Sequence, residues 1–153
     1  MSHATKTAAP AERWADRAEA ALAAAGHRRG GARRAVLELL GGQECALTAQ
    51  EMEDRLRGGA RRSVSRASIY RVLDELEGLR LVQRVETGQA MVRYERVCDA
   101  GEHHHHLVCD RCGVVIPFSD PALERAISSI SRRVPLAVSE HEIVLRGQCR
   151  DCA

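Results

Sequence analysis

The sequence predicts an α+β fold in two parts: an N-terminal winged helix-turn-helix domain and a small C-terminal α/β domain organised around four cysteines. Three observations lead to this prediction. The front of the chain has a series of helix-type segments that ends in a β-hairpin pattern. The back has short β-type runs on either side of one helix-type segment. Two Cys-x-x-Cys pairs, Cys109/Cys112 and Cys149/Cys152, lie within that back part.

The chain is expected to divide into four stretches: a disordered tail at 1–10, a winged-helix domain at 11–96, a hinge at 97–102 and a metal-binding domain at 103–153. Residues 1–98 carry 17 basic and 13 acidic side chains, against 6 and 8 in the remainder. This mild positive excess at the front is compatible with an anionic partner. Aromatic residues make up only 3% of the chain, so packing relies on aliphatic side chains, and a small domain of that kind often needs a structural metal.

Three helices are expected before the recognition segment. Residues 11–25 are rich in alanine, the strongest helix former. Residues 32–40 place apolar side chains on one face and charged ones on the other. Thr48 and Glu51 have the spacing of a capping box, which predicts a third helix from Thr48 to Leu56.

A fourth helix and a hairpin follow. The helix is expected to begin at Ser65 and to end near Gly78. Its apolar face consists of Ile69, Val72, Leu73 and Leu76. Two alternating runs, Val82–Glu86 and Met91–Glu95, flank the turn Thr87–Gln89 and predict a β-hairpin.

This order of elements predicts a winged helix-turn-helix whose fourth helix enters the major groove of DNA while the hairpin touches the backbone. Five side chains on that helix lie off the apolar face and are available for phosphates and base edges: Ser65, Arg66, Ser68, Tyr70 and Arg71. The alternative is that Tyr70 packs in the core and the arginines are merely solvated.

The back part is predicted to be a small α+β module. Leu107–Val108 and Val114–Phe118 are short β-type runs on either side of the first cysteine pair. Asp120 can cap a helix that has Pro121 at its first position. Residues 141–146 alternate between polar and apolar side chains, as expected for a strand that leads to the last cysteine pair.

No targeting or membrane segment is expected. Met1 to Pro10 has neither an apolar signal core nor a cleavage pattern. No apolar run approaches the ~20 residues that span a bilayer. The protein is therefore expected to be cytoplasmic and to have no membrane partner, and in that compartment paired cysteines favour metal binding over a disulfide.

Four thiolates from two Cys-x-x-Cys knuckles match the tetrahedral coordination of zinc. Four unrelated cysteines are the simplest alternative, but they do not explain the paired spacing. A redox dithiol explains one pair and not two. The sequence therefore predicts that Cys109, Cys112, Cys149 and Cys152 hold a structural zinc ion.

A run of four histidines, His103 to His106, stands directly before the first cysteine pair. In an extended strand its alternate side chains face opposite sides, so one run can serve two metal sites. Glu124 and His141 are further ligand types in the same module with no other obvious task. The alternative, a purification tag, does not fit a run inside the chain that adjoins a cysteine pair.

These residues together resemble the ferric uptake regulator family. The resemblance is carried by the histidine run, the cysteine pair with Gly113 behind it, Glu124, His141 and the last cysteine pair. Ser68-Ile69-Tyr70-Arg71 is similar to the family's recognition-helix motif, Thr-Val-Tyr-Arg. Gly26-His27-Arg28, with Arg33 following, resembles the stretch whose basic residue reaches the minor groove, which assigns that role to Arg28.

The resemblance implies a dimeric repressor with three metal sites, whose C-terminal module is the dimerisation domain. The four cysteines would hold structural zinc. A dimerisation-domain site would consist of His103, His105, Glu124 and His141. A regulatory site would consist of Cys98, His104 and His106 with one further ligand.

Cys98 stands where zinc-responsive members place a thiolate, which favours the zinc uptake regulator branch, and thiolate with imidazole suits zinc by softness. Two departures leave the fourth regulatory ligand open. The acidic residue expected on the first hairpin strand is missing from Val82-Gln83-Arg84, and the histidine expected before the third helix is missing from Cys45-Ala46-Leu47. Glu95, Cys45 and a water remain as candidates for that position.

The expected function is that of a metal-dependent transcriptional repressor, not an enzyme, which binds double-stranded operator DNA as a homodimer and takes no small organic substrate. The regulatory metal is expected to be zinc, with iron, manganese and nickel as alternatives. An iron- or peroxide-responsive regulator of the same family is the first alternative function. A zinc-dependent hydrolase or deaminase, and a zinc-ribbon adaptor, are alternatives of other classes.

Overall fold

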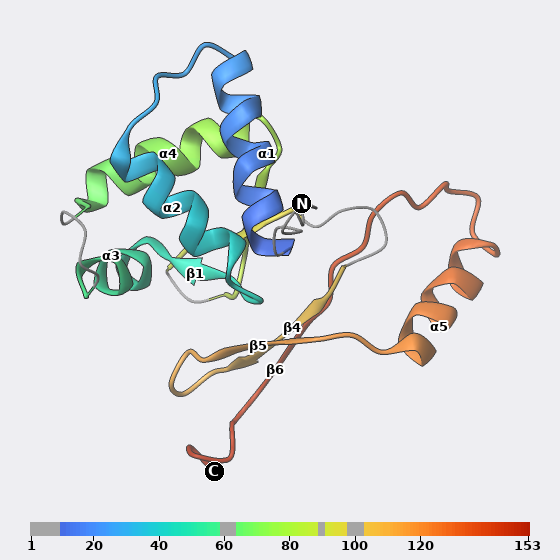
Figure 1. Cartoon of the computed structure of the whole chain (residues 1–153). Coiled ribbons are helices and arrows are strands. Elements are labelled where there is room, and N and C mark those ends of the chain that lie inside the picture. Colours follow the sequence, from blue (N-terminus) through green and yellow to red (C-terminus); the bar gives the residue numbers. More distant parts are fainter. Residues whose placement is uncertain (1–9, 59–63, 89–90, 98–102) are drawn as a thin grey trace, which may run out of the picture. The chain divides into compact units, whose positions relative to one another are not determined.

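The computed structural model describes residues 10–58, 64–88, 91–97 and 103–153, and it divides into two compact units, Met1–Val97 and Cys98–Ala153 (Figure 1). We call them the N-terminal and the C-terminal unit and treat each by itself. Helices and small sheets occur in the chain as the predicted α+β class requires, so that prediction is confirmed.

The N-terminal unit contains the four predicted helices. They are α1 (Pro10–Ala24), α2 (Gly31–Gly41), α3 (Ala49–Arg57) and α4 (Arg66–Gly78). The capping box of α3 is present: the Glu51 amide donates to the Thr48 hydroxyl at 3.1 Å, and the Thr48 amide donates to the Glu51 carboxylate at 2.7 Å. The Ser65 hydroxyl caps α4 by accepting from the Ser68 amide at 3.3 Å. Local capping hydrogen bonds therefore fix where α3 and α4 begin.

The core of this unit comes from the apolar faces of the helices. The predicted stripe of α4, Ile69 with Val72, Leu73 and Leu76, is fully or almost fully buried. It packs with side chains of the other helices, among them Trp14, Leu22, Leu37 and Met52. Because the stripe faces inward, the opposite face of α4 is left at the surface.

The N-terminal unit also contains a three-stranded sheet with the order β1-β3-β2, in which β1 comes from between α2 and α3 and the other two strands follow α4. The hairpin strands are β2 (Val82–Val85) and β3 (Arg93–Arg96), paired antiparallel. The second strand begins two residues later than predicted, because the pairing ends at Val85 with Arg93 and leaves Met91 and Val92 beyond the end of β2. Strand β1 (Leu47–Thr48) was not predicted, and it pairs with the other edge of β3.

The C-terminal unit contains β4 (His105–Cys109), β5 (Val115–Phe118), α5 (Pro121–Ser131) and β6 (Val144–Gly147). The sheet order is β5-β4-β6, with β4 antiparallel to β5 and parallel to β6. Asp120 caps α5 as predicted, since its carboxylate accepts from the Ala122 and Leu123 amides at 2.7 and 2.9 Å. Strand β6 begins three residues later than the predicted start at His141.

Apolar burial is sparse in the C-terminal unit. Among its described residues, Val108 and Cys109 are the buried apolar side chains, and no residue of α5 is buried. Figure 1 shows α5 beyond one end of the three strands. Something other than an apolar core must therefore stabilise this unit.

No helix in the described part of the chain combines the length and the apolar character that crossing a bilayer requires.

Candidate metal centres and nucleic-acid interface

The first candidate metal centre is the cluster of four cysteines. Cys109 ends β4, Cys112 follows in the turn, and Cys149 and Cys152 lie in the turn after β6. Parallel pairing of β4 with β6, with Cys109 opposite Gly147, brings the two turns together. The four sulfur atoms lie within 4.8 Å of one another, and Cys112 Sγ is 3.7 Å from Cys149 Sγ. A tetrahedral ion with bonds of about 2.3 Å to sulfur requires sulfur–sulfur distances of roughly 3.8 Å, so the cluster fits zinc.

The thiols in this cluster differ in acidity. The backbone amides of Cys112 and Cys149 donate to Cys109 and lower the pKa of its thiol to about 6. Hydrogen bonds with Cys149 and Cys112 raise the pKa of the Cys152 thiol to about 12. Neighbouring thiolates repel one another, which opposes ionisation of all four sulfurs together. A dication among them would reverse this and favour four thiolates.

The second candidate centre joins three histidines and a carboxylate. His105 from β4 and Glu124 from α5 are linked by 2.7 Å between Nε2 and Oε1. The other carboxylate oxygen of Glu124 lies 3.1 Å from His103 Nε2 and 3.0 Å from His141 Nε2. His103 and His141, whose imidazoles are more exposed than that of His105, have their Nε2 atoms 3.2 Å apart. The structure thus brings together all four residues that the resemblance assigns to the dimerisation-domain site.

This cluster has the donor set of a divalent transition-metal site. Hydrogen bonding from His105, with further contributions from His103 and His141, holds the pKa of the Glu124 carboxyl below its usual value. Three imidazole nitrogens and one carboxylate suit zinc and neighbouring first-row metals. Metal–nitrogen bonds of about 2.0–2.1 Å in a tetrahedron require roughly 3.3–3.4 Å between donors, close to the histidine–histidine distance above.

The other two histidines of the run follow the alternation expected of a strand. The rings of His104 and His106 have their centroids 5.0 Å apart, edge to face. His106 is almost fully buried. Cys98, predicted to join them in the regulatory site, lies outside the described residues, so that assignment stays a prediction.

The two protein candidates for the fourth regulatory ligand lie in the N-terminal unit. Glu95 is buried on β3, and its carboxylate accepts from the Gln83 side chain at 2.8 Å. Cys45 is half-buried, and burial raises the pKa of its thiol. The raised pKa disfavours the Cys45 thiolate, which is the form of this side chain that binds a metal ion.

The candidate nucleic-acid interface lies on the outward face of α4. Tyr70 is 45% exposed, so the alternative that it packs in the core is wrong. Arg71 is exposed as well. Arg66 is exposed but paired, with its Nη2 2.7 Å from the Glu53 carboxylate of α3. Ser65 and Ser68 bond each other through their hydroxyls at 3.0 Å, so both help to form the helix start.

Arg28, predicted to reach the minor groove, lies in the connection between α1 and α2. Its side chain is exposed, and it forms no ion pair with another described residue. The residue before it, His27, is linked to Arg33 and Glu75, a contact that the sequence did not reveal. Arg33 was assigned to the polar face of α2, but it is 5% exposed. No local pattern marks this burial, because its partner Glu75 stands 42 residues further along the chain.

Comparisons with known proteins agree on one family. The sequence model of the "Ferric uptake regulator family" matches residues 24–146. The ferric uptake regulation protein of Neisseria meningitidis is 39% identical over 88 residues, which are 56% of this chain and 58% of that protein. The chain therefore spans little more than half the length of the curated relatives that it matches.

Solved structures are similar over more of the chain. The ferric uptake regulator of Helicobacter pylori, described with three functional metal binding sites, has a TM-score of 0.78 at 26% identity and covers 93% of both chains. The ferric uptake regulator of Vibrio cholerae has a TM-score of 0.73 at 30% identity, covering 86% of this chain and 98% of that one. The predicted winged-helix fold class with a cysteine cluster in the C-terminal part is therefore confirmed.

Proposed function

Because this chain belongs to the ferric uptake regulator family, we propose that it is a metal-dependent transcriptional repressor that binds operator DNA when its regulatory site is loaded. The observation that carries the proposal is the presence of two separate donor clusters, one of four sulfurs and one of three imidazoles and a carboxylate, in one unit. Two clusters of different chemistry in a unit with almost no apolar core are difficult to explain without bound metal.

In this proposal the cysteine cluster holds zinc as a structural element. Structural zinc contributes apparent binding energies on the order of 10–16 kcal/mol in small domains. That contribution replaces the buried apolar area which the C-terminal unit lacks. The site formed by His103, His105, Glu124 and His141 binds a second divalent ion and ties α5 to β4 and to the segment before β6.

The regulatory metal is proposed to be zinc, held by Cys98, His104 and His106 with Glu95 as the fourth ligand. Support comes from the donor types, since a thiolate and imidazoles favour zinc over harder metals. Between the two protein candidates, Glu95 is favoured over Cys45 because burial raises the pKa of the Cys45 thiol and so disfavours the thiolate that would bind a cation.

DNA binding is proposed for the outward face of α4, with Arg66, Ser68, Tyr70 and Arg71 facing the major groove and Arg28 the minor groove. The exposure of Tyr70 and Arg71 supports this role. Arg66 would exchange its contact with Glu53 for one with DNA, because an exposed ion pair is worth only about 0–1 kcal/mol.

A homodimer is proposed through the exposed face of the C-terminal sheet. Leu107, Ile116 and Leu145 lie opposite one another on β4, β5 and β6. They are 38%, 46% and 48% exposed, and together they form a continuous apolar row. Such a row on a sheet face is typical of a subunit interface, and a two-fold axis through it would also pair two winged helices for two operator half-sites.

The test begins by selecting a duplex from a random-sequence DNA pool with the zinc-loaded protein. Binding of this duplex is then titrated with zinc, iron(II), manganese and nickel and with chelator, using fluorescence anisotropy. We expect tight binding with zinc and loss of binding with chelator. Failure to enrich any duplex, or equal binding with and without metal, would refute the proposed function.

Two variants test the regulatory ligands. His104→Ala and Cys98→Ser are expected to abolish metal-dependent DNA binding while the dimer stays folded. Glu95→Gln tests the fourth ligand, and Cys45→Ser is its matched comparison, expected to bind DNA as the unchanged chain does. The opposite ranking of the last two variants would move the fourth ligand to Cys45.

A further inference from the structure

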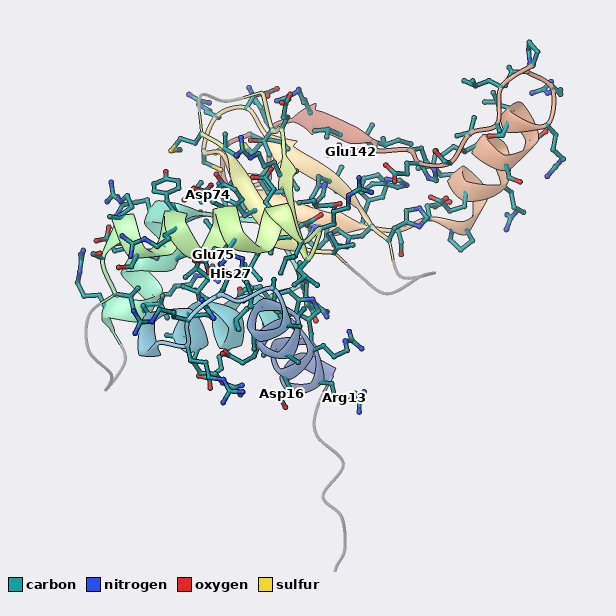
Figure 2. The ribbon with its side chains drawn as sticks, turned by 90° about the horizontal axis from the view of Figure 1, so that it is seen from above. Arg13, Asp16, His27, Asp74, Glu75 and Glu142 are labelled. Carbon is teal, nitrogen blue, oxygen red and sulfur yellow. The ribbon has the colours of Figure 1, made fainter. Side chains whose placement is uncertain are left out.

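A cluster of polar side chains around the buried Arg33 joins the connection between α1 and α2 to the last turn of α4. The two carboxylate oxygens of Glu75, on α4, contact different residues. Oε2 accepts from Arg33 at 3.0 Å, and Oε1 lies 3.5 Å from His27 Nδ1. Arg33 on α2 donates a second hydrogen bond, at 3.2 Å, to the carbonyl oxygen of His27. Figure 2 shows His27 and Glu75 next to each other. His27 is thus held through both its side chain and its backbone.

Arg33 is the buried member of the cluster, and its burial makes these contacts significant. The side chain of Arg33 is 6% exposed and that of Glu75 is 20% exposed. A buried guanidinium without a counter-charge is strongly destabilising. The Glu75 carboxylate supplies that counter-charge to Arg33. An ion pair of this kind also fixes geometry, because a planar guanidinium and a carboxylate align through directed hydrogen bonds.

Apart from the cluster, the connection is closed onto α1 up to His27 and is less constrained between His27 and α2. Gly26 follows α1 with a φ of +84°. The amide of the next residue, His27, donates to the Leu22 carbonyl at 3.0 Å and closes that helix. At the other end, Gly30 caps α2 without any side-chain hydrogen bond, and Gly31 follows it. Side chains added at Gly30 or Gly31 would meet nothing within 4 Å, so packing does not restrain this end of the connection. Glycines leave the backbone free to adopt many conformations.

Arg28 and Arg29 lie between these two ends, directly after His27. Arg28 is exposed and pairs with no described acidic residue, whereas Arg29 is 3.9 Å from Glu19. An arginine that must enter a narrow groove binds more tightly when its backbone is fixed beforehand, because less conformational freedom is lost on binding. The fixed point nearest to Arg28 is the His27 backbone. Its amide bonds to Leu22 of α1, and its carbonyl oxygen accepts from Arg33, which Glu75 holds in turn.

We propose that Glu75, acting with Arg33 through His27, is a positioning residue that fixes the α1–α2 connection so that Arg28 meets the DNA. This inference rests on the proposed function, since it assigns Glu75 a part in operator binding. Glu75 itself touches no DNA in this proposal. It links the recognition helix to the minor-groove arginine, so that both contact the duplex as one rigid surface.

A double-mutant cycle on the full-length, metal-loaded dimer tests the proposal with the selected duplex. Arg28→Ala alone is expected to weaken binding about tenfold. Glu75→Gln alone, which keeps an acceptor for Arg33, is expected to weaken it about fivefold. In the Glu75→Gln background, Arg28→Ala should cost at most about twofold, because the arginine is no longer positioned. A full tenfold loss in both backgrounds would overturn the proposal.

Two controls separate positioning from a loss of stability. His27→Ala removes the side-chain contact with Glu75 but leaves the Arg33–Glu75 pair and the Arg33 bond to the carbonyl of residue 27 in place. It should therefore give a smaller non-additive effect of the same sign, which can be measured even if Glu75→Gln folds poorly. Glu38→Gln, a matched change at an exposed acid that pairs with Arg34, should leave DNA affinity and the effect of Arg28→Ala unchanged. Positioning also predicts that Glu75→Gln lowers the slope of log affinity against log salt by about one, as Arg28→Ala does.

Hydrogen exchange provides a readout that needs no DNA. The amides of residues 28–30 should exchange faster in His27→Ala than in the unchanged chain, while those of α4 should not. If the unchanged protein fails to bind DNA with metal, the proposed function and this inference both fall. If it binds but the cycle is additive, only the positioning role is refuted.

Discussion

The two units of this chain are stabilised by different means. The N-terminal unit has a core of buried aliphatic side chains drawn from four helices and a small sheet. The C-terminal unit buries Val108 and Cys109 among its described apolar side chains, and instead gathers cysteines, histidines and a glutamate into two clusters. One unit can fold by excluding water, whereas the other buries too little apolar area for this, and we propose that bound metal stabilises it instead. The proposed metals would therefore stabilise the C-terminal unit without being needed for the folding of the N-terminal one.

Removal of the structural metal should separate the two units most clearly. Cys109→Ser is expected to release zinc and unfold the C-terminal unit, at a cost on the order of 10–16 kcal/mol of metal binding. NMR spectra should lose the dispersed signals of residues 103–153 and retain those of the N-terminal unit. Asp110→Asn, a change in the same knuckle at an exposed residue, should alter neither set. A C-terminal unit that stays folded without zinc would show that metal is not what stabilises it.

A cavity in the apolar core should affect only the N-terminal unit. Leu73 is fully buried on α4, so Leu73→Ala is expected to lower the free energy of unfolding of that unit by about 2–5 kcal/mol. Thermal unfolding monitored for each unit measures the change. Leu145→Ala, at an exposed position on β6, should leave that transition unchanged and weaken self-association instead. Equal effects of the two variants on the N-terminal unit would show that the stabilities of the two units are not independent.

The histidine–glutamate cluster should respond to one carboxylate. Glu124→Gln is expected to weaken binding of one metal ion per chain by at least about tenfold, because Glu124 contacts all three histidines. Metal content after dialysis measures this, with Glu142→Gln as the matched control at an exposed position (Figure 2). Binding at this site should also weaken at low pH, because protons compete with the metal for its ligands. Unchanged metal content in Glu124→Gln would remove this residue from the ligand set.

The smallest predicted effect concerns the start of α3. Thr48→Ala removes one half of the capping box and is expected to cost about 1 kcal/mol in the N-terminal unit. Chemical denaturation measures it, with the exposed change Glu44→Ala expected to stay within about 0.5 kcal/mol. A loss from Glu44→Ala equal to that from Thr48→Ala would show that the cap does not determine the stability of α3.

Elements with strong local signals could be predicted from the sequence. The caps at Thr48 and Asp120 and the apolar stripe of α4 each depend on residues close together in the chain, and each lies where it was expected. The alternation of the histidine run was likewise local, since it follows from the geometry of one strand. The grouping of Glu124 and His141 with that run came from the family resemblance and not from any local pattern.

Features created by long-range pairing could not be predicted. Strand β1 is two residues long, too short for a periodic pattern, and it exists because it pairs with β3. The start of β3 depends on its register with β2. The burial of Arg33 depends on Glu75, which approaches it only when α2 packs on α4. In each case the physical cause lies in a partner distant in the sequence.

Metal control of DNA binding is tested most directly by measuring DNA affinity while only the regulatory metal is removed. Full-length protein is titrated with a selected duplex at chelator strengths that leave the cysteine-bound zinc in place, as verified by metal content. We expect an affinity loss of about a hundredfold or more, as a coupling of roughly 3 kcal/mol requires, and we expect added zinc to restore the affinity. Undiminished and equally selective binding by the partly stripped protein would contradict it.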